Sequence, residues 1–169
     1  MRRELWIVEP SLWNVDHVVA DLEAIRQYNP QRFEMEQLTA VIHEDAERRV
    51  CLGYKDLARD EFWVRGHVSR TPVMPGTLMC EAAAQLANYY ALKHKLYAVP
   101  GSFVGLKGVR CRHFVRPGER LFVAVKLLKI RADLLTCQFQ CAVRRRLVCE
   151  GVLIGGALTW IDGQRRRVT

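Results

Sequence analysis

A nearly uncharged segment at about residues 77–94 constrains the fold more than any other part of the sequence. It reads TLMCEAAAQLANYYALKH. Up to position 91, its strongly polar residues are Glu81, Gln85 and Asn88. A helix that is apolar on nearly every side is buried in a core, and the preceding Pro75 and Gly76 suit a helix start. The sequence therefore predicts one long central helix that the rest of the chain encloses.

The segments around this helix have the composition of β-strands. Two precede it and flank the polar tripeptide DAE, at residues 37–44 and 48–55. Four follow it, divided by short turn sequences, at residues 102–115, 119–131, 134–145 and 147–161. A short amphipathic helix is also predicted at residues 15–27, ended by Asn29 and Pro30. The chain is expected to be an α+β protein with an antiparallel sheet of about six strands.

Length and composition indicate one globular domain over residues 1–169. Half of the 169 residues are hydrophobic, which suits a single core and leaves little room for a second. Residues 1–14 are expected to form an N-terminal extension, and residues 159–169 a basic C-terminal tail. No apolar run reaches the roughly 18 residues that a membrane span needs, and Glu4 and Glu9 interrupt the region where a signal peptide is apolar. We therefore expect a cytoplasmic protein without a membrane span.

The cysteines and the charge bear on redox chemistry and on the class of partner. The six cysteines form no Cys-x-x-Cys pair, so we expect buried free thiols at Cys51, Cys80, Cys111, Cys137, Cys141 and Cys149. The net charge is +8, with arginines clustered at residues 110–120, 144–146 and 165–167. Nucleic acid is not favoured as a partner, because zinc-finger spacing, an aromatic RNP-like run and a basic recognition helix are missing. An acidic protein partner, an anionic cofactor and a solvated basic surface remain as explanations.

Residues 66–85, GHVSRTPVMPGTLMCEAAAQ, point most directly to chemistry. His67 stands fourteen residues before Glu81, which three alanines follow. Burial of a carboxylate is costly, so Glu81 needs either a partner or a reaction that uses it, and Gln85 lies on the same helix face. The first N–H groups of a helix are unpaired and positively polarised, so the Gly76 amide can face a partly negative oxygen. A structural role for His67 remains the alternative, as is common for a lone loop histidine.

This segment resembles the active-site segment of the (3R)-hydroxyacyl-[acyl-carrier-protein] dehydratases of fatty acid biosynthesis, the FabZ/FabA-like hot-dog proteins. In that family, a Gly-His-Phe-Pro-type turn leads to Pro-x-Met-Pro-Gly and to a helix that bears the acid. The positions that coincide without a gap are Gly66, His67, Pro72, Met74, Pro75, Gly76, Glu81 and Gln85. The likeness covers roughly residues 25–158. Val68 and Ser69 depart from the usual Phe and Pro, which affects the expected shape of the acyl tunnel and the rigidity of the turn.

The resemblance implies a hot-dog fold, in which a curved antiparallel sheet wraps around the long helix. It also implies a homodimer, with further assembly into a trimer of dimers. Each of the two sites would take its histidine from one subunit and its acid from the other. The implied partner is an acidic acyl carrier protein whose phosphopantetheine carries the acyl thioester, and the arginine-rich surface offers a physical reason for docking. Neither a metal nor a redox cofactor is expected.

The resemblance further implies a role for each site residue in the β-elimination of water. His67 is expected to remove the C2 proton, and the Gly76 N–H to stabilise the enolate oxygen of the thioester. Glu81 is expected to protonate the leaving hydroxyl directly or through a water, with Gln85 orienting it. Two other functions fit the same fold. One is a hot-dog acyl thioesterase, and the other is a non-catalytic acyl-binding partner subunit.

Overall fold

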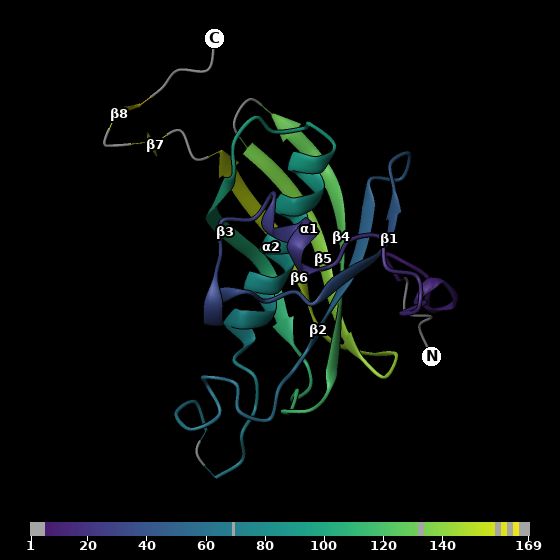
Figure 1. Ribbon diagram of the computed structural model, residues 1–169, viewed down its shortest axis with the longest axis vertical. Coiled ribbons are helices and arrows are strands. Elements are labelled where there is room, and N and C mark those ends of the chain that lie inside the picture. The colour runs from purple at the N-terminus through teal and green to yellow at the C-terminus, as the bar shows by residue number, and fades with distance from the viewer. Residues whose placement is uncertain (1–5, 69, 132–133, 158–159, 162–163, 166–169) are drawn as a thin grey trace.

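Six antiparallel strands form one sheet that curves around a long helix in the computed structural model of the protein (Figure 1). The structure describes residues 6–68, 70–131, 134–157, 160–161 and 164–165. The strands run β1-β2-β4-β5-β6-β3 across the sheet. Their bounds are β1 Ala40–Asp45, β2 Val50–Asp56, β3 Gly101–Cys111, β4 Arg120–Arg131, β5 Leu134–Val143 and β6 Arg146–Ala157. The predicted α+β class, the six-stranded sheet and the hot-dog fold are confirmed.

The central helix α2 spans Gly76–Lys93 and lies against the inner face of the sheet (Figure 1). It contacts all of the strands from β2 to β6. Side chains along a strand point alternately to its two faces, so every second residue of β4 and β5 points to the helix. These residues are almost fully buried: Leu121, Val123, Val125, Leu127, Leu135, Cys137, Phe139 and Cys141. The prediction of a buried central helix is confirmed, with both ends within one residue of the expected positions.

The N-terminal segment covers part of the outer face of the sheet, where it forms a second apolar cluster. Ile7 and Val8 are buried against residues of β1, β2 and β4. The Trp13 ring stacks on the Phe122 ring with their centroids 4.9 Å apart, and the Ile7 N–H donates to Gln140 Oε1 at 2.8 Å. The expected extension at residues 1–14 is thus, from residue 6 onward, an additional layer on the sheet.

The prediction of a helix over residues 15–27 is wrong for its first part. Helix α1 spans only Leu22–Arg26, and Asp21 caps it by accepting a hydrogen bond from the Ala24 N–H at 2.9 Å. Before the cap, the chain pairs with β1, because the Val41 N–H donates to Ala20 O at 2.8 Å. Valines favour such extended pairing and aspartate favours the N-cap, so the helix starts later than the apolar spacing suggested.

Short 3₁₀ turns lie at Pro10–Leu12 and Phe33–Met35. The last predicted strand ends at Ala157, and the strands β7 Trp160–Ile161 and β8 Gln164–Arg165 form a separate pair. All six cysteines are free, but Cys111 is exposed, so the expectation of buried thiols is wrong at this one position on an edge strand. Among the described residues, we find no helix with the length and apolar character needed to cross a membrane.

Candidate active site

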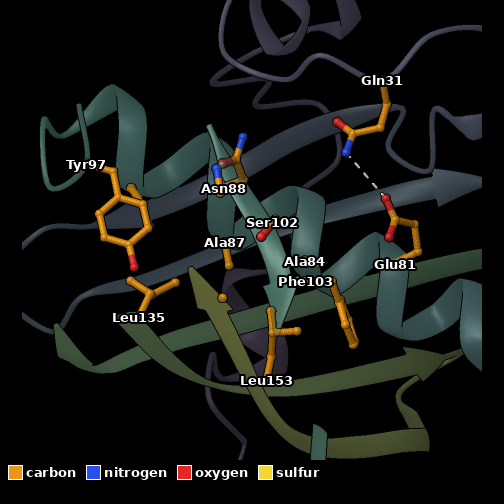
Figure 2. Close-up of a pocket in the computed structure, with 13 residues that line it drawn as sticks. Gln31, Glu81, Ala84, Ala87, Asn88, Tyr97, Ser102, Phe103, Leu135 and Leu153 are labelled. Carbon is orange, nitrogen blue, oxygen red and sulfur yellow. Dashed lines mark hydrogen bonds between the residues drawn. The ribbon is translucent and has the colours of Figure 1, made fainter. Parts of the chain in front are cut away.

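A cavity lies between one face of α2, strand β3 and the chain that follows α1 (Figure 2). It holds about 490 Å³ of space not filled by protein atoms, part of which is open to solvent. Its wall is mainly apolar, with four polar side chains. The lining residues include Ala84, Ala87, Tyr97, Phe103, Leu135 and Leu153 on the apolar side and Gln31, Glu81, Asn88 and Ser102 on the polar side. Such a cavity suits a mostly hydrocarbon ligand with a few polar atoms.

Glu81 lies in this wall and is bound by two amide side chains. Gln85 Nε2 donates to Glu81 Oε1 at 2.8 Å, and Gln31 Nε2 approaches the same oxygen at 3.5 Å. Figure 2 shows Gln31 facing Glu81 from the chain that follows α1. Both donors meet Oε1, so the other oxygen, Oε2, is the one available to a ligand. The cost of placing a carboxyl among alanines is therefore offset by these hydrogen bonds.

Gln85 is buried, with only 3% of its surface exposed, and its side chain is held by backbone groups. Its Oε1 accepts from the Gln37 N–H at 2.9 Å, and its Nε2 also donates to Met35 O at 2.7 Å. A backbone N–H can only donate and a carbonyl can only accept, so these two bonds determine which end of the Gln85 amide is the oxygen. The Nε2 group must consequently face Glu81.

His67 lies in the long connection from β2 to α2, which extends beyond one end of the sheet (Figure 1). The residue is exposed, and its Nδ1–H donates to Val73 O at 2.9 Å. The carbonyl accepts only, so Nδ1 carries a hydrogen and, in the neutral ring, Nε2 keeps its lone pair. This is the tautomer that can take a proton at Nε2. The loop is anchored nearby, since the Met74 N–H donates to Val115 O at 2.8 Å.

Gly76 begins α2, and its surroundings leave no room for a side chain. A Cβ on this residue would lie 2.7 Å from the Cys111 Sγ. No side chain caps this helix start, and among the described residues we find no acceptor for the Gly76 N–H. The close approach explains the glycine in packing terms, and the open amide is the kind of donor that an anionic oxygen meets at a helix start.

The structure brings together some of the predicted site residues but not all of them. Glu81 and Gln85 are directly bonded. His67 does not belong to the cavity wall that contains Glu81, and within the described chain no hydrogen bond joins the two. Among the described residues, no group of three or more His, Cys, Asp and Glu side chains is arranged to hold a metal ion.

Gln31 is a site residue that the sequence reasoning missed. It follows Asn29 and Pro30, which the sequence analysis considered only as the end of a predicted helix. The Asn29 Nδ2 donates to Gln85 O at 3.0 Å, and Asn88 Nδ2 donates to Asn29 Oδ1 at 2.8 Å. The polar face of the predicted helix was the available signal, because each of its polar residues bonds to residues 28–37.

Residues 29–154 match the family of FabA-like domains. A 3-hydroxyacyl-[acyl-carrier-protein] dehydratase FabZ from Syntrophobacter fumaroxidans (strain DSM 10017 / MPOB) is 32% identical over 136 residues, which is 79% of this chain and 91% of that protein.

Solved structures share the fold at low sequence identity. The dehydratase heterocomplex ApeI:P from Xenorhabdus doucetiae superimposes with a TM-score of 0.64 at 19% identity, covering 79% of this chain and 90% of that one. A hypothetical thioesterase with coenzyme A from Streptococcus pneumoniae TIGR4 gives a TM-score of 0.53 at 8% identity, covering 75% and 87%. At these identities the likeness concerns the fold alone.

Proposed function

Because the chain belongs to the family of FabA-like domains, we propose that it dehydrates (3R)-3-hydroxyacyl thioesters to trans-2-enoyl thioesters. The observation that carries this proposal is the placement of Glu81. Its carboxyl is held by a buried amide in the wall of a mainly apolar cavity, with one oxygen left for a ligand. A hydroxyacyl chain needs this combination of an apolar wall for its hydrocarbon part and a proton donor for its hydroxyl.

In the proposed reaction, the C2–H bond breaks and His67 Nε2 takes the proton. The electron pair of that bond passes through the enolate, whose oxygen accepts a hydrogen bond from the Gly76 N–H. This electron pair then forms the C2–C3 double bond as the C3–O bond breaks. Glu81 Oε2 protonates the departing hydroxyl directly or through a water, and water leaves. The bond between the His67 Nδ1–H and Val73 O supports the histidine role, since it leaves Nε2 as the acceptor.

We propose that each complete site is formed by two copies of the chain. The support is that His67 is exposed and does not belong to the cavity wall that contains Glu81. In this arrangement, the loop of one copy delivers His67 to the cavity of the other. The homodimer is the unit required, and a trimer of dimers would repeat it.

The proposed substrate carrier is an acyl carrier protein. The support is charge, because the arginines at the β5–β6 turn and near the start of β4 are exposed, including Arg116, Arg144, Arg145 and Arg146. Positive patches steer an acidic partner over long range. Coenzyme A is the competing carrier for the same phosphopantetheine arm.

The test is a two-signal assay on the purified protein. A (3R)-hydroxyacyl thioester is supplied on acyl carrier protein or on coenzyme A, while enoyl absorbance reports dehydration and free thiol reports hydrolysis. We expect enoyl formation without thiol release, a reverse reaction from the trans-2-enoyl thioester, and a higher kcat/KM on the carrier protein. Thiol release without enoyl formation would assign a thioesterase. Binding without either signal would assign a non-catalytic acyl-binding subunit.

A further inference from the structure

Three strands and the first turns of α2 bring a group of thiols together beneath the helix start. In the register of the sheet, Cys149 of β6 lies directly opposite Cys111 of β3 and directly opposite Cys141 of β5. Cys80 of α2 reaches the same place, and its interaction with Cys149 shifts the pKa of both thiols. None of these residues has a part in the proposed reaction.

Cys111 and Cys149 are the pair with the geometry for a covalent bond. Their Sγ atoms are 3.4 Å apart. The Arg112 N–H donates to Val148 O at 2.7 Å, so the adjacent pair of residues 111 and 149 is at a non-hydrogen-bonded position of the antiparallel ladder. Side chains come closest at such positions, where the Cα atoms are about 4.5 Å apart. That separation falls within the range of about 4.4–6.8 Å found across disulfides.

The two thiols differ in access. Cys111 is exposed and Cys149 is buried. The interaction with Cys80, followed by burial, raises the pKa of Cys149 well above its usual value. In a single copy, Cys111 is therefore the thiol that an external oxidant meets first. Cys149 is the second thiol. Only a small fraction of it is thiolate, but its contact with Cys111 places it next to the sulfur that it attacks.

We propose that Cys111 and Cys149 form a reversible disulfide when the protein meets a small-molecule disulfide such as oxidised glutathione. The Cys111 thiolate attacks the external disulfide, forms a mixed disulfide and releases one small thiol. Cys149 then loses its proton and attacks the Cys111 sulfur, which releases the second small thiol and forms the protein disulfide. Two protein thiols are oxidised while one external disulfide is reduced to two thiols. The sulfur atoms approach from 3.4 Å to about 2.05 Å.

This bond would act on the helix start, because Cys111 Sγ packs against Gly76. Movement of the sulfur toward Cys149 removes the atom that supports Gly76. Resting on the proposed function, the consequence is slower dehydration by the oxidised protein, since the Gly76 N–H is the proposed donor to the thioester oxygen. Disulfide formation itself does not depend on that function.

The test follows the thiols directly in the full-length protein. The reduced protein is incubated with oxidised glutathione, alkylated, and analysed by intact mass and peptide mapping. We expect two thiols to be lost, a peptide linked through Cys111 and Cys149, and full reversal by dithiothreitol. Cys111→Ser should abolish the loss of two thiols. Cys141→Ala is the matched control, since Cys141 also faces Cys149 but its Sγ bonds to Met79 O at 3.7 Å, and this variant should behave as the wild type.

Several results would overturn the proposal. A bond between Cys80 and Cys149, a stable glutathione adduct with Cys149 still alkylated, or unchanged oxidation in Cys111→Ser would each do so. If the disulfide forms but the dehydration rates of oxidised and reduced protein agree, the link to the helix start is wrong while the disulfide stands. If the reduced protein shows no dehydration, it is the proposed function that fails, and the mass measurement still decides the disulfide.

Discussion

Glu81 shows how a carboxyl can be both part of the packing and available for chemistry. Its Oε1 is taken by Gln85, and the Gln85 amide is in turn fixed by backbone groups of Met35 and Gln37. When Glu81 carries a proton, that proton occupies Oε2, because Oε1 already accepts a hydrogen bond. The side chain can therefore give a proton to a ligand without losing its anchor.

Replacement of Glu81 separates these two roles. Glu81→Gln keeps the volume and an oxygen that accepts from Gln85, but it has no carboxyl proton to donate. We expect kcat for dehydration to fall by about 10²–10⁴-fold, the usual contribution of a general acid, with the thermal midpoint almost unchanged. Enoyl absorbance measures kcat, and a melting curve measures the thermal midpoint. The exposed carboxyl of Glu34 gives the control, and Glu34→Gln should keep full activity; equal activity in both variants would contradict the acid role.

Gln85 and Gln31 both approach Glu81 Oε1, but at different distances. Gln85→Leu leaves the Met35 carbonyl and the Gln37 N–H without a partner and Glu81 Oε1 with only its long contact to Gln31. We therefore expect a loss of roughly 3 kcal/mol in the free energy of unfolding. Gln31→Leu removes only the 3.5 Å contact and should cost less than about 1 kcal/mol. Urea unfolding of both variants checks the order. A larger loss in Gln31→Leu would show that the 3.5 Å contact is the stronger one.

For the helices and strands, the sequence predicted an element correctly where a local pattern of residues determines its structure. Helix α2 and the six strands follow from apolar runs and turn residues, which act locally. The helix prediction was wrong for residues 15–20, because the pairing of Ala20 with Val41 joins positions far apart in the chain. For the same reason Glu81 and Gln85 were identified from their helical spacing, whereas Gln31 became visible only when the chain after α1 was folded against α2.

The start of α2 offers a prediction about packing. Gly76→Ala places a Cβ 2.7 Å from Cys111 Sγ, so we expect a loss of about 1–3 kcal/mol, as for other overpacked sites. The clash is with a side-chain atom, and Cys111→Ala removes that atom. The double variant should therefore recover most of the loss, measured by urea unfolding of the two single variants and the double variant. If the losses of the two single variants simply add in the double variant, the backbone at Gly76, and not the Cys111 sulfur, is what requires a glycine.

The other end of α2 is joined to β1 by Glu44. Burial raises the pKa of this carboxyl, but hydrogen bonds from Lys93, Tyr89 and His94 together outweigh burial and hold the pKa below its usual value. The Tyr89 hydroxyl donates at 2.8 Å and Lys93 Nζ at 2.9 Å, both to Oε1.

This arrangement predicts a dependence of stability on pH. The pKa is lower in the folded than in the unfolded state, so the stabilisation is complete above the unfolded pKa of about 4.3 and is lost as the pH falls through the folded value. Glu44→Gln should lower the free energy of unfolding at pH 7 by about 2 kcal/mol and lose less stability than the wild type between pH 6 and pH 3. Urea unfolding across this range provides the measurement. Parallel curves for the two proteins would contradict the contribution of Glu44.

At the scale of the whole molecule, a single copy leaves one edge of the sheet open. Strand β3 is the last in the order of the sheet, and it exposes Phe103, Val104 and Leu106 at 48%, 56% and 39%. Apolar edge strands invite pairing with another chain, and Phe103 also lines the cavity that contains Glu81. A second copy at this edge would cover exposed apolar surface next to the cavity, which supports the proposed dimer.

The composite site predicts that two inactive variants restore each other. His67→Ala homodimers lack the base in both sites, and Glu81→Gln homodimers lack the acid in both. In a mixed dimer, the His67 loop of the Glu81→Gln copy meets the cavity of the His67→Ala copy, where Glu81 is intact, so one site is complete and the other lacks both groups. Random exchange of equal amounts gives half mixed dimers with one site of two, hence about a quarter of wild-type kcat per chain. Native mass spectrometry confirms the exchange, and enoyl absorbance measures the activity. Exchange without recovered activity would place both groups in one chain, and the loop that carries His67 would then have to fold over its own cavity when substrate binds.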